Sequence, residues 1–138
     1  MNLNKGVDMT DKELVDLAIK SRENAYNPYS GFRVGAALIT EDGTVYTGCN
    51  IESVSFTPTI CAERTAVSKA VSEGHRKIMK IAIASDLETD FIYPCGVCRQ
   101  VLCEFMPKNG VIIVSKPNGE YKSHALEEVF PFGFSSYK

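Results

Sequence analysis

Hydrophobic positions along the chain recur at two spacings, and each spacing predicts a different kind of element. Leucines and alanines follow Thr10 at helical spacing, and Glu13 stands where a capping box needs it, so we expect a helix over residues 11–26. Three further helices are predicted, over residues 61–73, 96–105 and 126–129, with Gly74 as a C-cap of the first and Pro107 ending the second.

Short runs of apolar and β-branched residues predict strands between these helices. A turn signal at residues 41–44 joins residues 33–40 to residues 45–49, which predicts an antiparallel hairpin. Residues 79–84 are apolar at nearly every position, as in a strand buried on both faces. Two more strands are predicted, at residues 111–115 and 121–123.

The order of these elements predicts an α/β fold, a three-layer α/β/α arrangement with a mixed sheet of about five strands. The hairpin should pair antiparallel, and the β-α-β-α-β part should pair parallel because it has helical crossovers. The helices at residues 61–73 and 96–105 would then begin at the carboxyl ends of central strands and face one crevice. We find no repeat or linker, so residues 1–138 form a single domain.

Composition narrows the classes of partner. The net charge is −2 and no Lys/Arg cluster stands out, which disfavours a nucleic acid polymer and favours a small molecule. Apolar runs such as residues 111–114 are far shorter than the roughly twenty residues of a membrane span. The first residues carry acids and no apolar block, so we expect no secretory signal, no membrane partner and a cytoplasmic location.

Two cysteine-containing motifs, "CAER" and "PCGVC", carry the candidate chemistry. Cys95 and Cys98 form a CxxC at a loop-to-helix junction, a spacing that suits tetrahedral Zn²⁺ and also a redox dithiol. Cys61 begins another predicted helix and adds a third ligand, the number typical of a catalytic zinc site. Cys103 should point away from the ion, whereas Cys49 stays open as the fourth ligand of a structural site.

The residues that follow Cys61 suit a catalytic metal site. Glu63, two positions after a zinc thiolate, can reach the open coordination position and move protons to and from water. Taken alone, Glu63 would be better explained as an acid favoured by the helix dipole, and the neighbouring three-cysteine site reverses that preference. Arg64 can donate to the thiolates and offset their excess negative charge, and Arg99 is a second candidate for that role.

With these motifs in order, the chain resembles the small homotetrameric cytidine deaminases, which are zinc-dependent enzymes. The resemblance runs from "YSGFRVGAAL" through "GCNIE" and "CAERTA" to "PCGVCRQVLCEF". It implies a cytidine deaminase-like fold and hydrolysis of cytidine and deoxycytidine to uridine and deoxyuridine plus ammonia, in pyrimidine salvage. It also implies one Zn²⁺ per chain, held by the three cysteines, with Glu63 as the catalytic proton carrier.

The resemblance further implies a set of substrate contacts and shared active sites. Phe32 matches the residue that packs against the pyrimidine, and Asn50 and Glu52 match residues that hydrogen-bond the ribose hydroxyls. The Ala62 backbone N–H matches a donor to the base carbonyl. Phe134 matches an aromatic residue that enters a neighbouring subunit's active site, which implies a homotetramer.

Two alternatives stay open at this point. Related deaminases act on blasticidin, deoxycytidylate, guanine or an adenine in transfer RNA, although Asn50 and Glu52 together with Arg64 favour a free nucleoside. The alternative from another class is a zinc-stabilised binding module without chemistry. Glu63 discriminates between the classes, because its replacement by glutamine would be nearly silent in a binding module.

Overall fold

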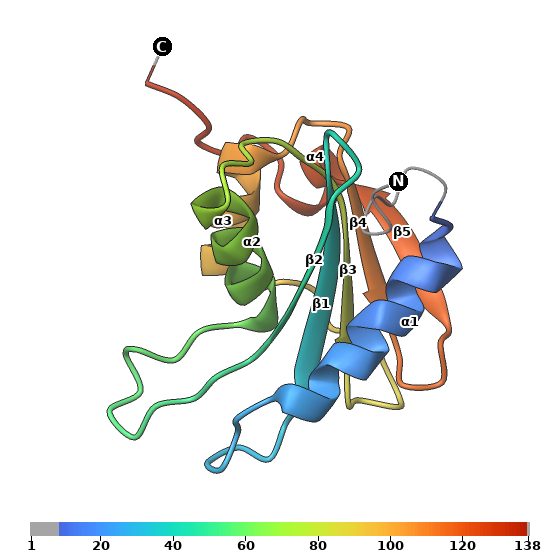
Figure 1. The fold of residues 1–138 in the computed structure, drawn as a ribbon, viewed down its shortest axis with the longest axis vertical. Helices are drawn as coiled ribbons and strands as arrows, with labels where there is room; N and C mark the ends of the chain where they lie inside the picture. The colour runs from blue at the N-terminus through green and yellow to red at the C-terminus, as the bar shows by residue number, and fades with distance from the viewer. Residues whose placement is uncertain (1–8, 138) are drawn as a thin grey trace.

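Two hydrophobic clusters, one on each face of a mixed five-stranded sheet, organise residues 9–137, which are the residues that this computed structural model describes (Figure 1). The strand order is β2-β1-β3-β4-β5. The strands are β1 (Val34–Thr40), β2 (Val45–Cys49), β3 (Ile78–Ser85), β4 (Val111–Ser115) and β5 (Tyr121–Ala125). The predicted α/β fold with a mixed sheet of five strands is therefore confirmed.

Helices cover both faces of the sheet, with α1 on one face and α2 and α3 on the other (Figure 1). They are α1 (Asp11–Ser21), α2 (Ala62–Ser72), α3 (Gly96–Phe105) and α4 (Leu126–Val129), and a 3₁₀ turn, η1 (Arg22–Asn24), follows α1. Within the described residues, none of the helices combines the length and the apolar character needed to cross a membrane.

The first helix begins as predicted and ends earlier. The Thr10 hydroxyl accepts from the Glu13 amide at 3.1 Å and the Glu13 carboxylate accepts from the Thr10 amide at 2.9 Å, which completes the capping box. The prediction that the helix reaches Tyr26 is wrong. Tyr26 instead pairs with Ile51 in an isolated β-bridge, and its amide donates to the Asn50 carbonyl at 3.0 Å, so the backbone is already extended there.

The sheet differs from the prediction in the position of one strand. The hairpin β1–β2 is antiparallel and β3–β4 is parallel, as expected. However, β2 does not pair with β3, because β1 lies between them and is antiparallel to both. Two successive antiparallel pairings leave β2 and β3 running in the same direction. For this reason α2 and α3 still begin at the same edge of the sheet.

Alternation along the central strands divides the core between the two faces. Leu38 and Ile83 belong to the cluster that packs under α2, α3 and α4. Their neighbours Ala37 and Ala82 point to the opposite face and pack against α1. Because β1, β3 and β4 are buried on both faces, the sheet is a rigid platform from which the loops at its edge extend.

Two glycines allow helices to lie directly on strands. A Cβ added at Gly35 in β1 would overlap the Ala18 carbonyl oxygen of α1 and lie 2.8 Å from the Arg22 amide nitrogen. A Cβ at Gly48 in β2 would lie 2.6 Å from the Ala62 carbonyl oxygen, in the first turn of α2. The obstacles are backbone atoms, which cannot turn aside as a side chain can. Gly48 thus fixes where α2 begins relative to the sheet.

We expect Gly35→Ala to destabilise the protein by about 1–3 kcal/mol, because α1 must shift to admit the methyl group. The urea midpoint of unfolding measures the change. Gly96→Ala is the matched control, since a Cβ there meets nothing within 4 Å. A Gly35→Ala protein as stable as the control would contradict the close packing of α1 on β1.

Candidate active site

Three cysteine sulfurs meet where α2 and α3 begin. Cys61 is the N-cap residue of α2, Cys95 is the N-cap residue of α3, and Cys98 lies in the first turn of α3. Their sulfur atoms all lie within 4.8 Å of one another, and those of Cys61 and Cys95 are 3.9 Å apart. Three sulfurs at about 2.3 Å from one tetrahedral Zn²⁺ are separated by roughly 3.8 Å. The group therefore fits a single zinc ion.

The helix starts make these cysteines good metal ligands. Neither Cys61 nor Cys95 caps its helix through the side chain, so their sulfurs are not engaged with the backbone. The exposed N–H groups of a helix N-terminus place a partial positive charge near the sulfur and favour the thiolate. Both helices direct this charge at the same point, which supports thiolate ligation.

The site has three cysteine ligands rather than four. Within residues 9–137, no further His, Cys, Asp or Glu ligand atom belongs to the group. Cys103 instead lines a cavity with Phe130 and Leu126, on the side of α3 that faces α4. Cys49, which the sequence left open as a fourth ligand, also lies outside the group. Three ligands leave a coordination position for water, as in catalytic zinc sites.

The structure places Arg64 against the Cys61 sulfur. Its Nη2 donates to the Cys61 sulfur at 3.5 Å, and its Nε is buried without a hydrogen-bond partner among the described residues. Interaction with Cys98, reinforced by Arg64, lowers the pKa of Cys61, whereas the pKa of Cys98 is raised because it shares its proton with Cys61. The hydrogen bond to Cys61 also raises the pKa of Arg64, so its guanidinium remains charged.

Glu63 is buried in the first turn of α2, with 5% of its surface exposed. Burial raises the pKa of its carboxyl group to about 7, and the neighbouring Cys61 thiolate acts in the same direction. An acid that served only the helix dipole would remain in water, where ionisation costs little. A buried carboxyl group beside metal-ligating sulfurs is instead typical of a functional site.

Asn50 holds the start of β1 with both ends of its amide. Its Nδ2 donates to the Phe32 carbonyl at 2.8 Å, and its Oδ1 accepts from the Val34 amide at 2.9 Å. Phe32 is half-buried just before β1, so Asn50 and Phe32 lie together at the edge of the sheet. The sequence predicted a substrate contact at Asn50 and did not predict this bracing of the backbone.

Glu52 organises the adjacent loop in a similar way. Its carboxylate accepts from the backbone amides of Tyr29 and Ser30, at 3.0 and 3.1 Å, and from the Ser30 hydroxyl. The Ser30 hydroxyl, together with the two amides, holds the pKa of Glu52 below its usual value. The Ser30 oxygen in turn accepts from the Phe32 amide at 3.0 Å. Phe32, Asn50 and Glu52 thus belong to one connected group.

Arg99 does not meet the prediction that it acts on the sulfurs. Its Nε donates to the Pro94 carbonyl at 2.7 Å and its Nη1 to the Val129 carbonyl at 2.6 Å. One residue further along the helix turns a side chain by about 100°, which directs Arg99 away from the sulfur of Cys98. Arg99 therefore braces the loop before Cys95 against α4.

Phe134 and Ala62, the two remaining predicted substrate contacts, lie after α4 and at the start of α2. Phe134 follows α4, its carbonyl accepts from Gln100 Nε2 at 2.7 Å, and its ring meets Tyr137 edge-on. More than half of the Phe134 side chain is exposed in a single chain. Ala62 is the first residue of α2, directly between Cys61 and Glu63.

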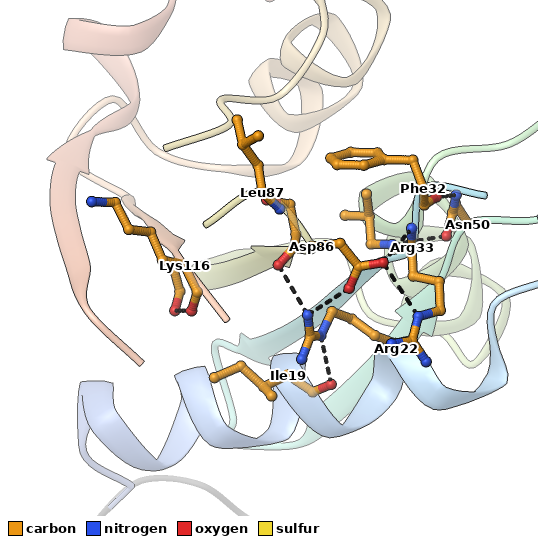
Figure 2. A network of polar contacts seen from close by, with 11 residues as sticks. Ile19, Arg22, Phe32, Arg33, Asn50, Asp86, Leu87 and Lys116 are labelled. Atoms are coloured by element: carbon orange, nitrogen blue, oxygen red, sulfur yellow. Dashed lines mark hydrogen bonds and ion pairs between the residues drawn. The ribbon is translucent and has the colours of Figure 1, made fainter. Parts of the chain in front are cut away.

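Sequence reasoning missed two residues near this group, Asp86 and Arg22, which Figure 2 shows in contact. Asp86 Oδ1 accepts from Arg22 Nη1 at 2.7 Å, and Asp86 Oδ2 accepts from the Arg33 amide at 3.0 Å. The available signal was an acid directly after a buried strand, where α/β proteins place polar groups. Nothing in the local sequence indicated Arg22 as its partner.

Comparison with known proteins gives consistent matches over most of the chain. The family model described as "Cytidine and deoxycytidylate deaminase zinc-binding region" matches residues 8–114. A cytidine deaminase of Sporosarcina psychrophila is 43% identical over 127 residues, which cover 92% of this chain and 93% of that protein. A probable cytidine deaminase of Dictyostelium discoideum is 44% identical over 130 residues, which cover 92% and 87% of the two chains.

The fold has equally similar counterparts among solved structures. The crystal structure of cytidine deaminase from Burkholderia pseudomallei superposes with a TM-score of 0.87 at 38% identity, and the match covers 91% of this chain and 100% of that one. The region matched by the family model contains all three sulfur ligands and Glu63. The comparisons and the geometry therefore point to the same site.

Metal analysis of the purified protein should find one zinc ion per chain, because the three sulfurs form one group. Cys61→Ser and Cys98→Ser should each lose most of this zinc, since either variant leaves two thiolates. Cys49→Ser is the matched control and should keep it. Zinc that survives removal of Cys61, or a second equivalent of tightly bound zinc, would contradict the three-sulfur site.

Proposed function

The chain belongs to the cytidine and deoxycytidylate deaminase family, and on that premise we propose that it hydrolyses cytidine and deoxycytidine to uridine and deoxyuridine, with release of ammonia. The observation that carries the proposal is the burial of Glu63 beside three convergent cysteine sulfurs. A carboxyl group in that position can transfer protons during hydrolysis, and a binding module has no need of it.

The metal-holding residues are Cys61, Cys95 and Cys98. A zinc ion bound there supplies a Lewis acid that makes water nucleophilic near neutral pH. Arg64 stabilises the thiolate form of Cys61 through its hydrogen bond to the sulfur. By withdrawing charge from the sulfur, Arg64 keeps a three-thiolate site from weakening that acidity.

Glu63 carries the proton transfers of the reaction. Deamination adds the elements of water at C4 of cytosine and expels the amino group as ammonia, so protons must leave the water and reach first N3 and then the departing nitrogen. The Glu63 carboxylate accepts the first proton and delivers it to N3, and it later transfers a proton to the leaving amine. Because Glu63 is almost completely buried, bulk water cannot compete for these protons.

The substrate contacts follow from the group at the edge of the sheet. Phe32 packs against the pyrimidine, and the Ala62 N–H donates to the base carbonyl. Asn50 and Glu52 hold the ribose hydroxyls. Asn50 retains one amide N–H beyond its bond to Phe32, and a carboxylate has more acceptor positions than Glu52 uses in the loop, which supports this assignment.

We further propose a homotetramer whose subunits share active sites. Several large apolar side chains are exposed in the loop of residues 50–60 and in the tail after α4, namely Val54, Phe56, Phe132 and Phe134. A group of large apolar side chains that is exposed on a single chain is typical of a surface that another chain covers. In this arrangement Phe134 reaches a neighbouring subunit's site. The physiological role is pyrimidine salvage in the cytoplasm.

Glu63→Gln should lower the rate of cytidine deamination by about 10²–10⁴-fold, because glutamine cannot carry a proton. The loss of ultraviolet absorbance on conversion to uridine measures the rate, and metal analysis should show that zinc is retained. Glu73→Gln, an exposed position at the end of the same helix, is the matched control. Equal rates for Glu63→Gln and wild type would exclude this mechanism.

The substrate assignment is tested with the same assay. Cytidine and deoxycytidine should both react, whereas deoxycytidylate and blasticidin S should react far more slowly. If the wild-type protein deaminates blasticidin S and neither nucleoside, the assigned substrate is wrong, whereas the assigned reaction, hydrolytic deamination, is correct.

A further inference from the structure

The start of β1 is held by side chains that take the place of a β-ladder. The last paired residues are Gly35 with Cys49 on the β2 side and Val34 with Ser85 on the β3 side. Asn50 and Asp86 directly follow those two partners, so each lies opposite β1 where its strand has ended. At this end of β1 the amides of residues 32–34 all donate to side chains, those of Ser30, Asp86 and Asn50.

From this arrangement we propose that Asp86 is a positioning residue for nucleoside binding, which fixes the backbone beside Phe32 and thereby the direction of its ring. The inference rests on the proposed function, because it takes Phe32 to be the residue that packs against the base. It assigns a role in substrate affinity to a carboxylate that does not itself touch the substrate.

The Asp86 carboxylate joins two parts of the chain with its two oxygens. Oδ2 accepts from the Arg33 backbone amide at 3.0 Å and from Arg33 Nε at 3.3 Å. Oδ1 accepts from Arg22 Nη1 at 2.7 Å. The Asp86 side chain is 26% exposed, so water screens these charge-assisted bonds less than it would on the open surface.

Arg22 keeps the Asp86 carboxylate in one orientation. The Arg22 side chain is only 13% exposed, and its Nη1 also donates to the Ser85 carbonyl at 3.0 Å. Its Nε donates to the Ile19 carbonyl at 3.1 Å, which ties the guanidinium to the last turn of α1 (Figure 2). The carboxylate is thus attached to a helix packed on the far face of the sheet.

Asn50 and Asp86 hold the Phe32 segment from opposite sides. Successive amides of an extended strand point in opposite directions. The Val34 amide accordingly donates to Asn50 Oδ1, and the Arg33 amide donates to Asp86 Oδ2. The Phe32 carbonyl is also held by Asn50, and Figure 2 shows the Phe32 ring on the side of the strand away from Arg22. With Asp86 removed, the Arg33 amide would lose its partner, and Asn50 and the Ser30 hydroxyl would be left to hold residues 32–34 ahead of the last β3 pair.

Asp86→Asn tests the proposal, because the amide can still fill the space and cannot offer two oxygens. KM for cytidine and the dissociation constant for uridine should each rise about tenfold, as expected for a displaced binding group. The value of kcat and the zinc content should change little. Asp16→Asn is the matched control, since it removes an exposed carboxylate that pairs with Lys12 on α1.

Two further variants separate positioning from stability. Asp86→Glu keeps the charge opposite Arg22 but displaces the oxygen from the Arg33 amide, so KM should rise even where the urea midpoint is hardly changed. In a Phe32→Ala background, Asp86→Asn should add little to the rise in KM, because residues that act through one group are not additive.

The proposal would be overturned if both Asp86 variants kept the KM and the uridine affinity of the wild type and only their urea midpoints fell. Asp86 would then have a structural role. An equal effect of Asp86→Asn with and without Phe32 would also overturn it. Wild-type protein that neither deaminates cytidine nor binds uridine would instead overturn the proposed function, and this inference with it.

Discussion

The convergence of two helix N-termini at one edge of the sheet is the constraint on which the site depends. Cys61 and Cys95 are N-cap residues of different helices, and neither helix alone could bring three sulfurs together. The common direction of β2 and β3 starts both helices at the same edge. Gly48 then lets α2 lie directly on β2, which sets the depth at which Cys61 and Glu63 enter the site.

Two neighbouring ionisable groups of the site, Cys61 and Glu63, have pKa values shifted in opposite directions. The pKa of Cys61 is lowered beside the half-buried Arg64, which donates to its sulfur, and two residues later a buried carboxyl group has a raised pKa. Sulfur and carboxyl group therefore differ in the sign of their pKa shifts although they share one helical turn. Desolvation dominates at Glu63, and hydrogen bonding dominates at Cys61.

Local patterns in the sequence predicted the helices, the strands and the metal ligands. The strand order and the ion pair of Asp86 depend on long-range contacts, which local patterns do not specify. The bounds of α3, β2 and β4 agree with the sequence, because caps, turns and apolar runs are local signals. The place of β1 between β2 and β3 depends on strand pairing, which no local signal specifies. The ion pair of Asp86 with Arg22 joins residues 64 positions apart, so it was likewise absent from the sequence reasoning. The roles of the substrate contacts remain predictions.

The two N-cap cysteines also link metal binding to folding. Cys61 and Cys95 are 34 residues apart, and β3 lies between them. An ion held by both closes that segment into a loop, as a disulfide would, and lowers the entropy of the unfolded chain only while it stays bound. The metal therefore acts as a reversible cross-link between two helices, and folding of the chain and binding of the metal are coupled in one equilibrium.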